Sequence, residues 1–168
     1  MAFWASKDLE PKKSYKYSVT MGNIAEPFLI KSAKLPSTTV STIEADYTQY
    51  KFYYPGKVTW EPVEFTIYDV LGPNSVATKL QAVLASAGFE FPADSGMKAT
   101  LSKSSAVGAI GDILINQLNS EGISKGTWKL INPFITNVDF GAHGYSDEAL
   151  MEVTLTVQYD WAEYSASA

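Results

Sequence analysis

The chain has 168 residues, of which 46% are hydrophobic, and this length and composition suit a single compact domain with a substantial core. It has no cysteine and one histidine, His143, which excludes disulfide scaffolds, thiolate metal sites and multi-histidine metal sites. All 13 basic residues are lysine and the net charge is −5, so the chain lacks the side chain that best recognises phosphate and guanine. We expect no metal, no cofactor and no sequence-specific nucleic-acid binding.

The surface composition favours a protein that assembles. Charged residues make up only 18% of the chain, whereas there are ten tyrosines and many serines and threonines. A surface that is short of charge and rich in hydroxyl groups suits protein interfaces. No run approaches the roughly 18 apolar residues of a membrane span. The N-terminal residues also lack the apolar centre of a signal peptide, so we expect a protein that is made and used without Sec export.

Alternating apolar and polar residues predict strands through the first half of the chain. Turn or break signals are found at Gly22-Asn23 and at 35–37. Pro55-Gly56 ends an aromatic segment over residues 50–57 and predicts another turn. The predicted strands are residues 15–21, a short strand that begins at Phe28, 40–47 and 63–67.

One main helix is predicted over residues 76–87, because Val76, Leu80 and Val83 lie on one helical face. A polar residue in Pro73-Asn74-Ser75 is expected to cap its first turn. Gly88 follows as a residue that accepts the left-handed conformation at a helix end. Residues 91–109 are rich in glycine, serine, lysine and alanine and predict a long loop.

Residues 110–118 fit either a helix or the first strand of a hairpin. Gly108 and Gly111 disfavour the helix, so we predict a strand over 112–118, a turn at 119–122 and a return strand through Trp128 and Leu130. Strict alternation predicts one long final strand from Glu152 to Trp161. The fold class is therefore mostly β with one main helix, a two-sheet sandwich or barrel. We expect one domain over 1–168 with short flexible ends.

Catalytic signatures are weak. His143 is the only imidazole and lies in a Gly-Ala-His-Gly loop, while Glu44 and Asp46 share a strand face without an evident cleft. We therefore expect no enzyme. The tyrosine-rich segment 47–54 suits a stacked ligand, a core or a protein interface equally well.

Several segments in order along the chain carry a family resemblance. They are residues 15–19 with 28–36, 55–67, the helix 76–87, 128–138 and 147–160. Together they resemble the tail tube protein of contractile-tailed bacteriophages, a family that shares its fold with the tubes of other contractile injection systems. The stretch 91–105 departs from the family in being longer and richer in serine and lysine.

The resemblance implies a structural role. Such subunits form hexameric rings whose sheets join into one barrel around a channel, and the rings stack into a tube. The implied partners are further copies of the chain, the tail sheath, the tape measure protein, and the baseplate and tail terminator proteins. DNA would pass through the channel without specific binding. The implied location is the virion tail, assembled in the host bacterial cytoplasm. Two alternatives remain: the tube of a non-phage injection system that carries protein effectors, and a monomeric β-sandwich module that binds a ligand.

The resemblance also suggests candidate residues, because in the family the connection around 47–57 extends toward the neighbouring ring. The ring-stacking candidates are Tyr47, Tyr50, Lys51, Tyr53, Tyr54, Gly56 and Lys57. Acidic groups on a channel wall would repel DNA phosphate. The lumen candidates are Glu44, Asp46, Glu61 and Glu64, although an outward or ring-interface position suits them nearly as well.

Overall fold

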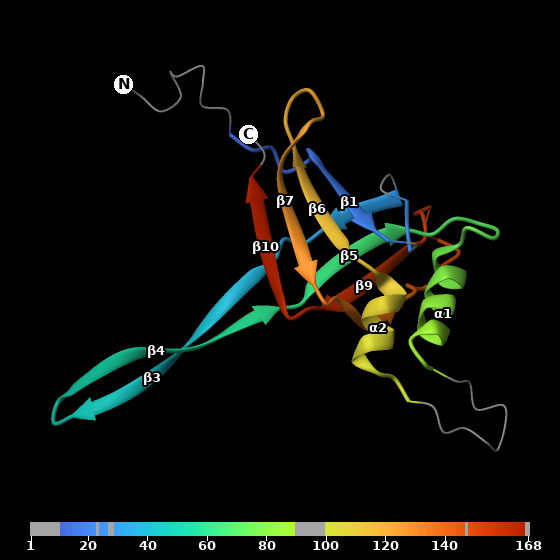
Figure 1. The fold of residues 1–168 in the computed structure, drawn as a ribbon. Helices are drawn as coiled ribbons and strands as arrows, with labels where there is room; N and C mark the ends of the chain where they lie inside the picture. Colours follow the sequence, from blue (N-terminus) through green and yellow to red (C-terminus); the bar gives the residue numbers. More distant parts are fainter. Residues whose placement is uncertain (1–10, 23, 27–28, 90–99, 147, 167–168) are drawn as a thin grey trace.

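Two four-stranded antiparallel sheets form a sandwich, and a two-stranded ribbon projects from it (Figure 1). This computed structural model describes residues 11–22, 24–26, 29–89, 100–146 and 148–166. The strands are β1 (Tyr17–Met21), β2 (Ile30–Ala33), β3 (Ser37–Tyr47), β4 (Tyr50–Glu61), β5 (Val63–Tyr68), β6 (Ile113–Leu118), β7 (Ser124–Ile131), β8 (Phe134–Asp139), β9 (Glu152–Gln158) and β10 (Trp161–Ala166). The helices are α1 (Val76–Ser86) and α2 (Lys103–Ile110). The predicted two-sheet β architecture is confirmed, with a second helix that was not predicted.

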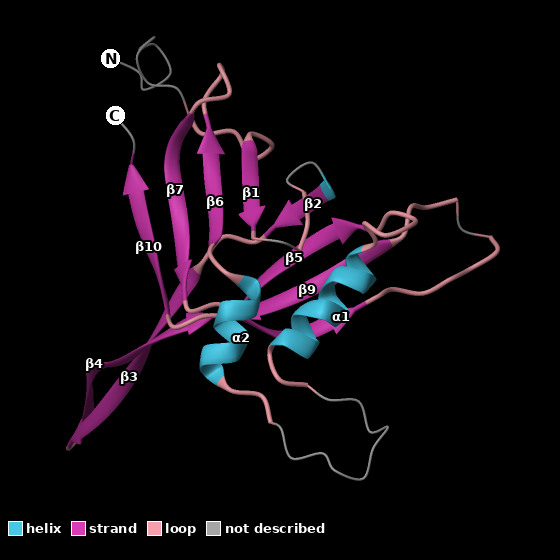
Figure 2. Ribbon diagram, turned by 45° about the vertical axis from the view of Figure 1, so that its right-hand side comes forward, coloured by secondary structure: helices cyan, strands magenta, loops and turns pink. Residues whose placement is uncertain are grey.

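The core lies between the two sheets. Sheet A has the order β1-β6-β7-β10, and sheet B has the order β2-β5-β9-β8 (Figure 2). Val19 and Ile115 of sheet A and Phe65 and Leu155 of sheet B are fully or almost fully buried, as the alternation along these strands predicts. Each such side chain contributes about 1.5–3 kcal/mol on burial. Within the described residues, neither helix is long and apolar enough to cross a membrane.

The final strand was predicted too long. Alternation continues from 152 to 161, but β9 ends at Gln158 in sheet B and β10 begins at Trp161 in sheet A. The Asp160 backbone N–H donates to the Ile131 carbonyl at 3.0 Å, which turns the chain from one sheet to the other. The described part of the C-terminal end, up to Ala166, belongs to β10. Residues 1–10 and 167–168 at the two ends of the chain lie outside the described residues, so the expectation of short flexible ends stays a prediction.

The Asp160 carboxylate joins this corner to α2. It accepts hydrogen bonds from Lys103 Nζ at 2.7 Å and from Asn132 Nδ2 at 2.7 Å. These hydrogen bonds lower the pKa of Asp160 below its ordinary value of 3.8, and the bond from Lys103 has the larger effect. Because the pKa is lowered in the folded state, these hydrogen bonds stabilise the fold at any pH above the ordinary pKa of a carboxyl group. That stabilisation is lost as the pH falls through the lowered pKa of the folded state.

This linkage predicts an acid-dependent difference between the wild type and Asp160→Asn. We expect the variant to melt below the wild type at neutral pH, and the difference between the two melting temperatures to shrink below about pH 4 as Asp160 protonates. Thermal unfolding followed by circular dichroism from about pH 7 to pH 2 measures this difference. A difference that stays constant over the whole range would contradict the prediction.

Helix α1 confirms the predicted amphipathic segment, and Gly88 follows it with a φ of 102°. The capping bond, however, was predicted on the wrong residue. Ser75 occupies the N-cap position but its side chain does not cap the helix. Instead, Asp69 Oδ1 accepts from the Val76 backbone N–H at 2.8 Å and from the Ser75 hydroxyl at 3.1 Å. The carboxylate of the residue that follows β5 therefore satisfies one free backbone N–H of the first turn.

Removing this carboxylate tests its role. We expect Asp69→Ala to lower the free energy of unfolding by about 1–2 kcal/mol, the usual cost of losing a helix cap. Ser75→Ala removes only the hydroxyl that donates a hydrogen bond to Asp69, so it should lower the free energy of unfolding by less than half as much. Urea denaturation measures both variants. A larger loss in Ser75→Ala than in Asp69→Ala would restore the serine as the capping residue.

Helix α2 corrects the predicted loop over residues 91–109, of which 91–99 lie outside the described residues. Ser102 Oγ accepts the Ser105 backbone N–H at 3.1 Å, and the buried side chain of Ile110 fixes the last turn against the core. Gly111, with a φ of 76°, ends the helix before β6. The hairpin preferred for the next residues is confirmed as β6 and β7.

Candidate assembly site on the projecting ribbon

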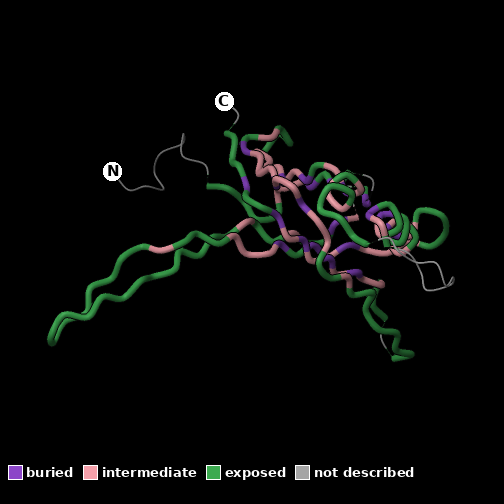
Figure 3. The backbone as a smooth tube through the Cα atoms, turned by 60° about the horizontal axis from the view of Figure 1, so that its bottom comes forward, coloured by how far each residue is buried: buried purple, intermediate pink, exposed green. Residues whose placement is uncertain are grey.

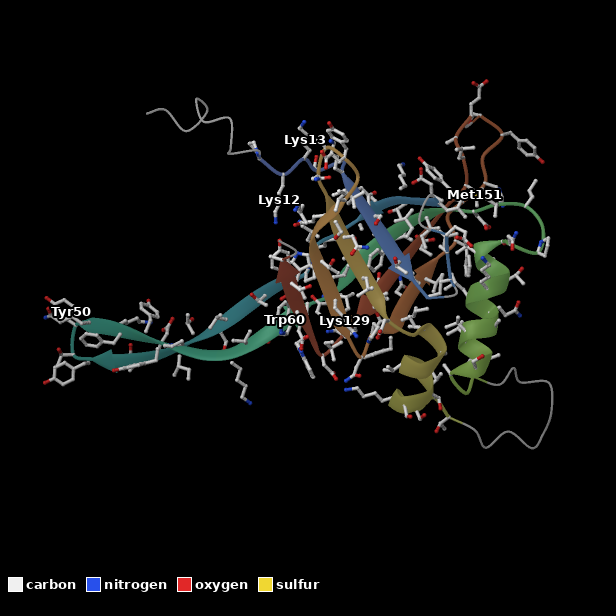
Figure 4. All side chains as sticks on the ribbon, turned by 45° about the horizontal axis from the view of Figure 1, so that its top comes forward. Lys12, Lys13, Tyr50, Trp60, Lys129 and Met151 are labelled. Atoms are coloured by element: carbon white, nitrogen blue, oxygen red, sulfur yellow. The ribbon has the colours of Figure 1, made fainter. Side chains whose placement is uncertain are left out.

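The ribbon of β3 and β4 continues the β2–β5 pair of sheet B beyond the sandwich. Three residues, 34–36, separate β2 from β3, and Pro62 alone separates β4 from β5. The Lys34 N–H donates to the Glu64 carbonyl at 2.9 Å, which joins the two connections. Eleven residues of β3 span about 35 Å at about 3.3 Å per residue. Trp60 lies at the root of the ribbon and Tyr50 at its tip (Figure 4). The ribbon therefore extends well away from the core, on the side opposite the helices (Figure 1).

The root of the ribbon is anchored to the core by Tyr159. Its hydroxyl donates to the Glu61 carbonyl at 2.8 Å, and its ring lies 5.9 Å from the Trp60 ring, centroid to centroid. Burial raises the pKa of Tyr159. A partly buried hydrogen bond and an aromatic contact thus fix the direction in which β4 leaves sheet B.

The predicted turn at Pro55-Gly56 is wrong, because β4 runs through both residues. Ser41 of β3 stands opposite two residues of β4, Gly56 and Lys57, and this extra residue makes a β-bulge. Ser41 Oγ accepts a hydrogen bond from the Lys57 N–H at 2.9 Å. A Cβ on Gly56 would lie 2.3 Å from Ser41 Oγ and 3.0 Å from the Ser41 carbonyl oxygen, so this close approach requires glycine. A proline is tolerated at a bulge in a ribbon where no third strand pairs. The chain reverses instead at Thr48-Gln49.

Almost every side chain of the ribbon faces solvent. All eleven residues of β3 are exposed, as is most of β4 (Figure 3). Large apolar groups are among them, with exposed fractions of 58% for Ile43, 53% for Phe52 and 58% for Tyr54. A two-stranded ribbon is marginal in water, and single chains rarely leave so much apolar surface uncovered. This pattern indicates a surface that is covered in an assembly.

The outer half of the ribbon has two unlike faces, since residues paired across an antiparallel ladder lie on the same face. We call one the aromatic face; its pairs are Ile43 with Tyr54, Ala45 with Phe52 and Tyr47 with Tyr50. We call the other the polar face; its pairs are Thr42 with Pro55, Glu44 with Tyr53 and Asp46 with Lys51. On the polar face Lys51 Nζ also lies 2.8 Å from Glu44 Oε2. The outer ribbon is therefore amphipathic.

All seven ring-stacking candidates lie on the ribbon but not on one face. Tyr47, Tyr50 and Tyr54 lie on the aromatic face, Lys51 and Tyr53 lie on the polar face, and Gly56 and Lys57 form the bulge. The choice by residue type missed Ile43, Ala45 and Phe52, which complete the aromatic face. Alternation along 42–47 was the signal that could have found the first two.

The four lumen candidates do not form one patch. Glu44 and Asp46 share the polar face near the tip of the ribbon. Glu61 lies at the root, where its carboxylate accepts from the Thr39 hydroxyl at 3.0 Å. Glu64 lies exposed on β5, on the side of sheet B away from the core.

The residues considered for catalysis also lie apart. His143 is exposed in the connection between β8 and β9, whereas Glu44 and Asp46 lie on the ribbon. Among the described residues, no three His, Cys, Asp or Glu side chains gather to hold a metal ion. The geometry found on the ribbon is that of a binding surface.

Comparison with known proteins places the fold. No family model matches the chain. No curated protein matches it in sequence either. Among solved structures, a chain of the sheath–tube complex of an extracellular contractile injection system, PVC, in its extended state, is similar with a TM-score of 0.68, 19% identity and coverage of 94% of this chain and 93% of that one.

Two further structures share the fold. A chain of the anti-feeding prophage (AFP) baseplate, 6-fold symmetrised, has a TM-score of 0.65 and 13% identity over 94% of this chain and 97% of that one. The SPP1 tail tube has a TM-score of 0.51 and 13% identity over 94% of this chain and 80% of that one. The chain therefore has a fold found in contractile injection systems and in the SPP1 tail tube, as the sequence resemblance implies.

Proposed function

We propose that this protein is a structural subunit of a tube, in which copies assemble into rings and the rings stack through the ribbon. One observation carries this proposal: the aromatic face places large apolar side chains in solvent on an arm that is anchored at its root and extends about 35 Å from the core. An arm of this kind gains stability only when another chain covers it. The role needs no catalytic group.

The similar structures support the shape of this assembly. One of them is described as a sheath–tube complex, one as a six-fold symmetrised baseplate and one as a tail tube. We infer that the rings contain six copies and that a sheath and a baseplate are partners. A tail terminator is a further proposed partner, as the family resemblance implies.

The cargo of the channel divides two forms of the proposal. In a phage tail, located in the virion and assembled in the host cytoplasm, the channel would hold a tape measure protein and then pass DNA. In a non-phage system it would carry protein effectors. Similarity to both kinds of structure supports the common role of tube subunit.

Negative-stain electron microscopy of the purified chain over a concentration series tests the function. We expect rings or hollow tubes whose amount rises steeply above a threshold concentration, because stacking rings is cooperative. Repeating the series with a crowding agent that promotes self-association extends the test to a subunit that polymerises slowly on its own. A monodisperse monomer under both conditions would contradict the proposal and favour the monomeric β-sandwich module.

A further inference from the structure

A groove with a volume of about 870 Å³ opens at one side of the sandwich, between β1 of sheet A and β2 of sheet B. Lys12, Lys13, Lys16 and Lys31 line it, and none of the described residues around it is aspartate or glutamate. The chain as a whole has 18 acidic residues against 13 basic ones, so this local excess of positive charge is opposite in sign to the net charge. We call this feature the lysine groove.

The floor of the lysine groove is apolar. Tyr17, Ile30 and Leu35 line it together with Ile115 and Leu118. Ile30 and Ile115 belong to the core, so the groove reaches the edge of the core, and Leu35 stays 43% exposed in the single chain. An apolar floor with a cationic rim suits a segment that carries both apolar and acidic side chains.

Lys12 is held at the rim by uncharged groups. Its Nζ donates to Gln117 Oε1 at 2.7 Å and to the Tyr164 hydroxyl at 2.8 Å, and it lies 4.9 Å from the centre of the Tyr164 ring. An ammonium group has three N–H donors, so one remains for a further acceptor. Lys31 differs, because Glu152 of the same chain pairs with it. Lys12 is therefore a positioned cation whose charge a carboxylate from another chain would balance.

A segment of the opposite character connects β8 with β9. Residues 139–151 contain three acidic residues and no lysine, and we call them the acidic connection. Two of the three acidic residues, Asp139 and Glu148, lie in the part of the chain that the structure describes, and both are exposed. Large apolar side chains accompany them, since Tyr145 is fully exposed and Leu150 is 73% exposed. The acidic connection thus has the two kinds of side chain that the lysine groove suits.

The two surfaces lie apart on one copy. β1 and β2 are edge strands of their sheets, whereas β8 is the opposite edge strand of sheet B. Figure 4 shows Lys12 and Lys13 well separated from Met151, the last residue of the acidic connection. A contact between the groove of one copy and the connection of another is therefore heterologous. Heterologous contacts repeat from copy to copy and build rings or open stacks.

We propose that the acidic connection of one copy docks in the lysine groove of a neighbouring copy, with Glu148 at the lysine rim and Leu150 on the apolar floor. This inference rests on the proposed tube function and adds a contact between copies that is separate from the ribbon. Opposite charges on the two surfaces favour the encounter of the right faces. Because these charges lie at an exposed rim, salt screens them, and assembly should weaken as the salt concentration rises.

Zero-length cross-linking with a carbodiimide tests the contact in the unmodified chain. The reagent joins a lysine ammonium to a carboxylate as an amide only where the two groups touch. Mixing isotope-labelled with unlabelled copies before assembly distinguishes links between copies from links within one copy. In assembled protein we expect an interchain link from a lysine of residues 12–16 to a carboxylate of the acidic connection. The ion pair of Lys31 with Glu152 within one copy is the positive control.

Charge reversal gives a second readout. Lys12→Glu and Glu148→Lys should each raise the threshold concentration for assembly about tenfold, because each places like charges together. The double variant exchanges the two charges and should bring the threshold to within about threefold of wild type. Lys12→Glu with Glu64→Lys is the matched control, since it has the same net charge but Glu64 is exposed on β5, so its threshold should stay high. Circular dichroism checks the fold of each variant.

Two results would overturn this inference while leaving the tube function intact. One is assembled wild-type protein that yields the Lys31–Glu152 link but no interchain link from the lysine groove to the acidic connection. The other is a charge-exchanged double variant that assembles no better than its matched control. Failure of the wild-type chain to form rings or tubes under either condition above would overturn both the inference and the tube function.

Discussion

Replacing Phe52 and Tyr54 together by serine is expected to abolish tube formation at concentrations at which the wild-type chain polymerises. Both side chains lie on the aromatic face of the outer ribbon and are more than half exposed in the single chain. In the proposed tube they are covered by another copy, where aromatic side chains contribute most of the binding energy. Neither belongs to the core, so the thermal stability of the single chain should stay within about 0.5 kcal/mol of wild type.

The size of this effect follows from ordinary interface energetics. Truncating an aromatic anchor costs about 2 kcal/mol or more, and each 1.4 kcal/mol is about tenfold in a binding constant. Two such losses raise the threshold concentration for assembly about a thousandfold. Sedimentation of polymer across a concentration series measures the threshold, and circular dichroism of the soluble fraction confirms the fold.

The control is the tyrosine between the two. Tyr53 has an exposed fraction of 61%, close to that of Tyr54, but it lies on the polar face opposite Glu44. Tyr53→Ser should therefore raise the threshold much less than Tyr54→Ser. Equal increases in the threshold concentration from these two single variants would show that assembly does not depend on the aromatic face more than on the polar face. Normal tubes from the Phe52/Tyr54 double variant would remove the ribbon from the stacking surface.

The sequence pattern predicted part of the ribbon correctly and placed its turn wrongly. The β-branched residues of 40–47 predicted a strand, which lies within β3, but Pro55-Gly56 indicated a turn where the chain continues as strand. Proline excludes a central strand, whereas here no third strand needs its missing N–H. The actual reversal at Thr48-Gln49 contains neither glycine nor asparagine, and Thr48 has a φ of 51°. Turn composition therefore pointed to the wrong place.

The other differences come from contacts between distant segments. The final alternation could not reveal a corner, because the aromatic residues Tyr159 and Trp161 continue the apolar spacing across Asp160, although Trp161 is exposed and Ala162 is the buried residue of β10. The hydrogen bond from Asp160 to Ile131 depends on the packing of β7. Helix α2 has a composition that favours a loop, and burial of Ile110 decides the outcome. The lumen candidates were chosen by charge, which says nothing about the face of a sheet that turns inward in an assembly.

Gly22→Ala is expected to destabilise the single chain by about 3 kcal/mol or more. Gly22 follows β1 with a φ of 41°, where an L side chain is strained by about 1–2 kcal/mol. A Cβ there would also lie 2.2 Å from the Ile110 carbonyl oxygen, a backbone atom at the end of α2. Either the turn or the helix end must move, and repacking of this kind costs about 1–3 kcal/mol in addition. Urea denaturation measures the loss.

Gly72→Ala separates the two causes, because Gly72 has a φ of 95° but no atom within 4 Å of the position that an alanine Cβ would take. It should cost only the conformational strain, about 1–2 kcal/mol. Equal losses of unfolding free energy in the two variants would mean that the close approach of the new Cβ to the Ile110 carbonyl adds no destabilisation. A larger loss in Gly22→Ala means that the turn after β1 and the end of α2 are held against each other.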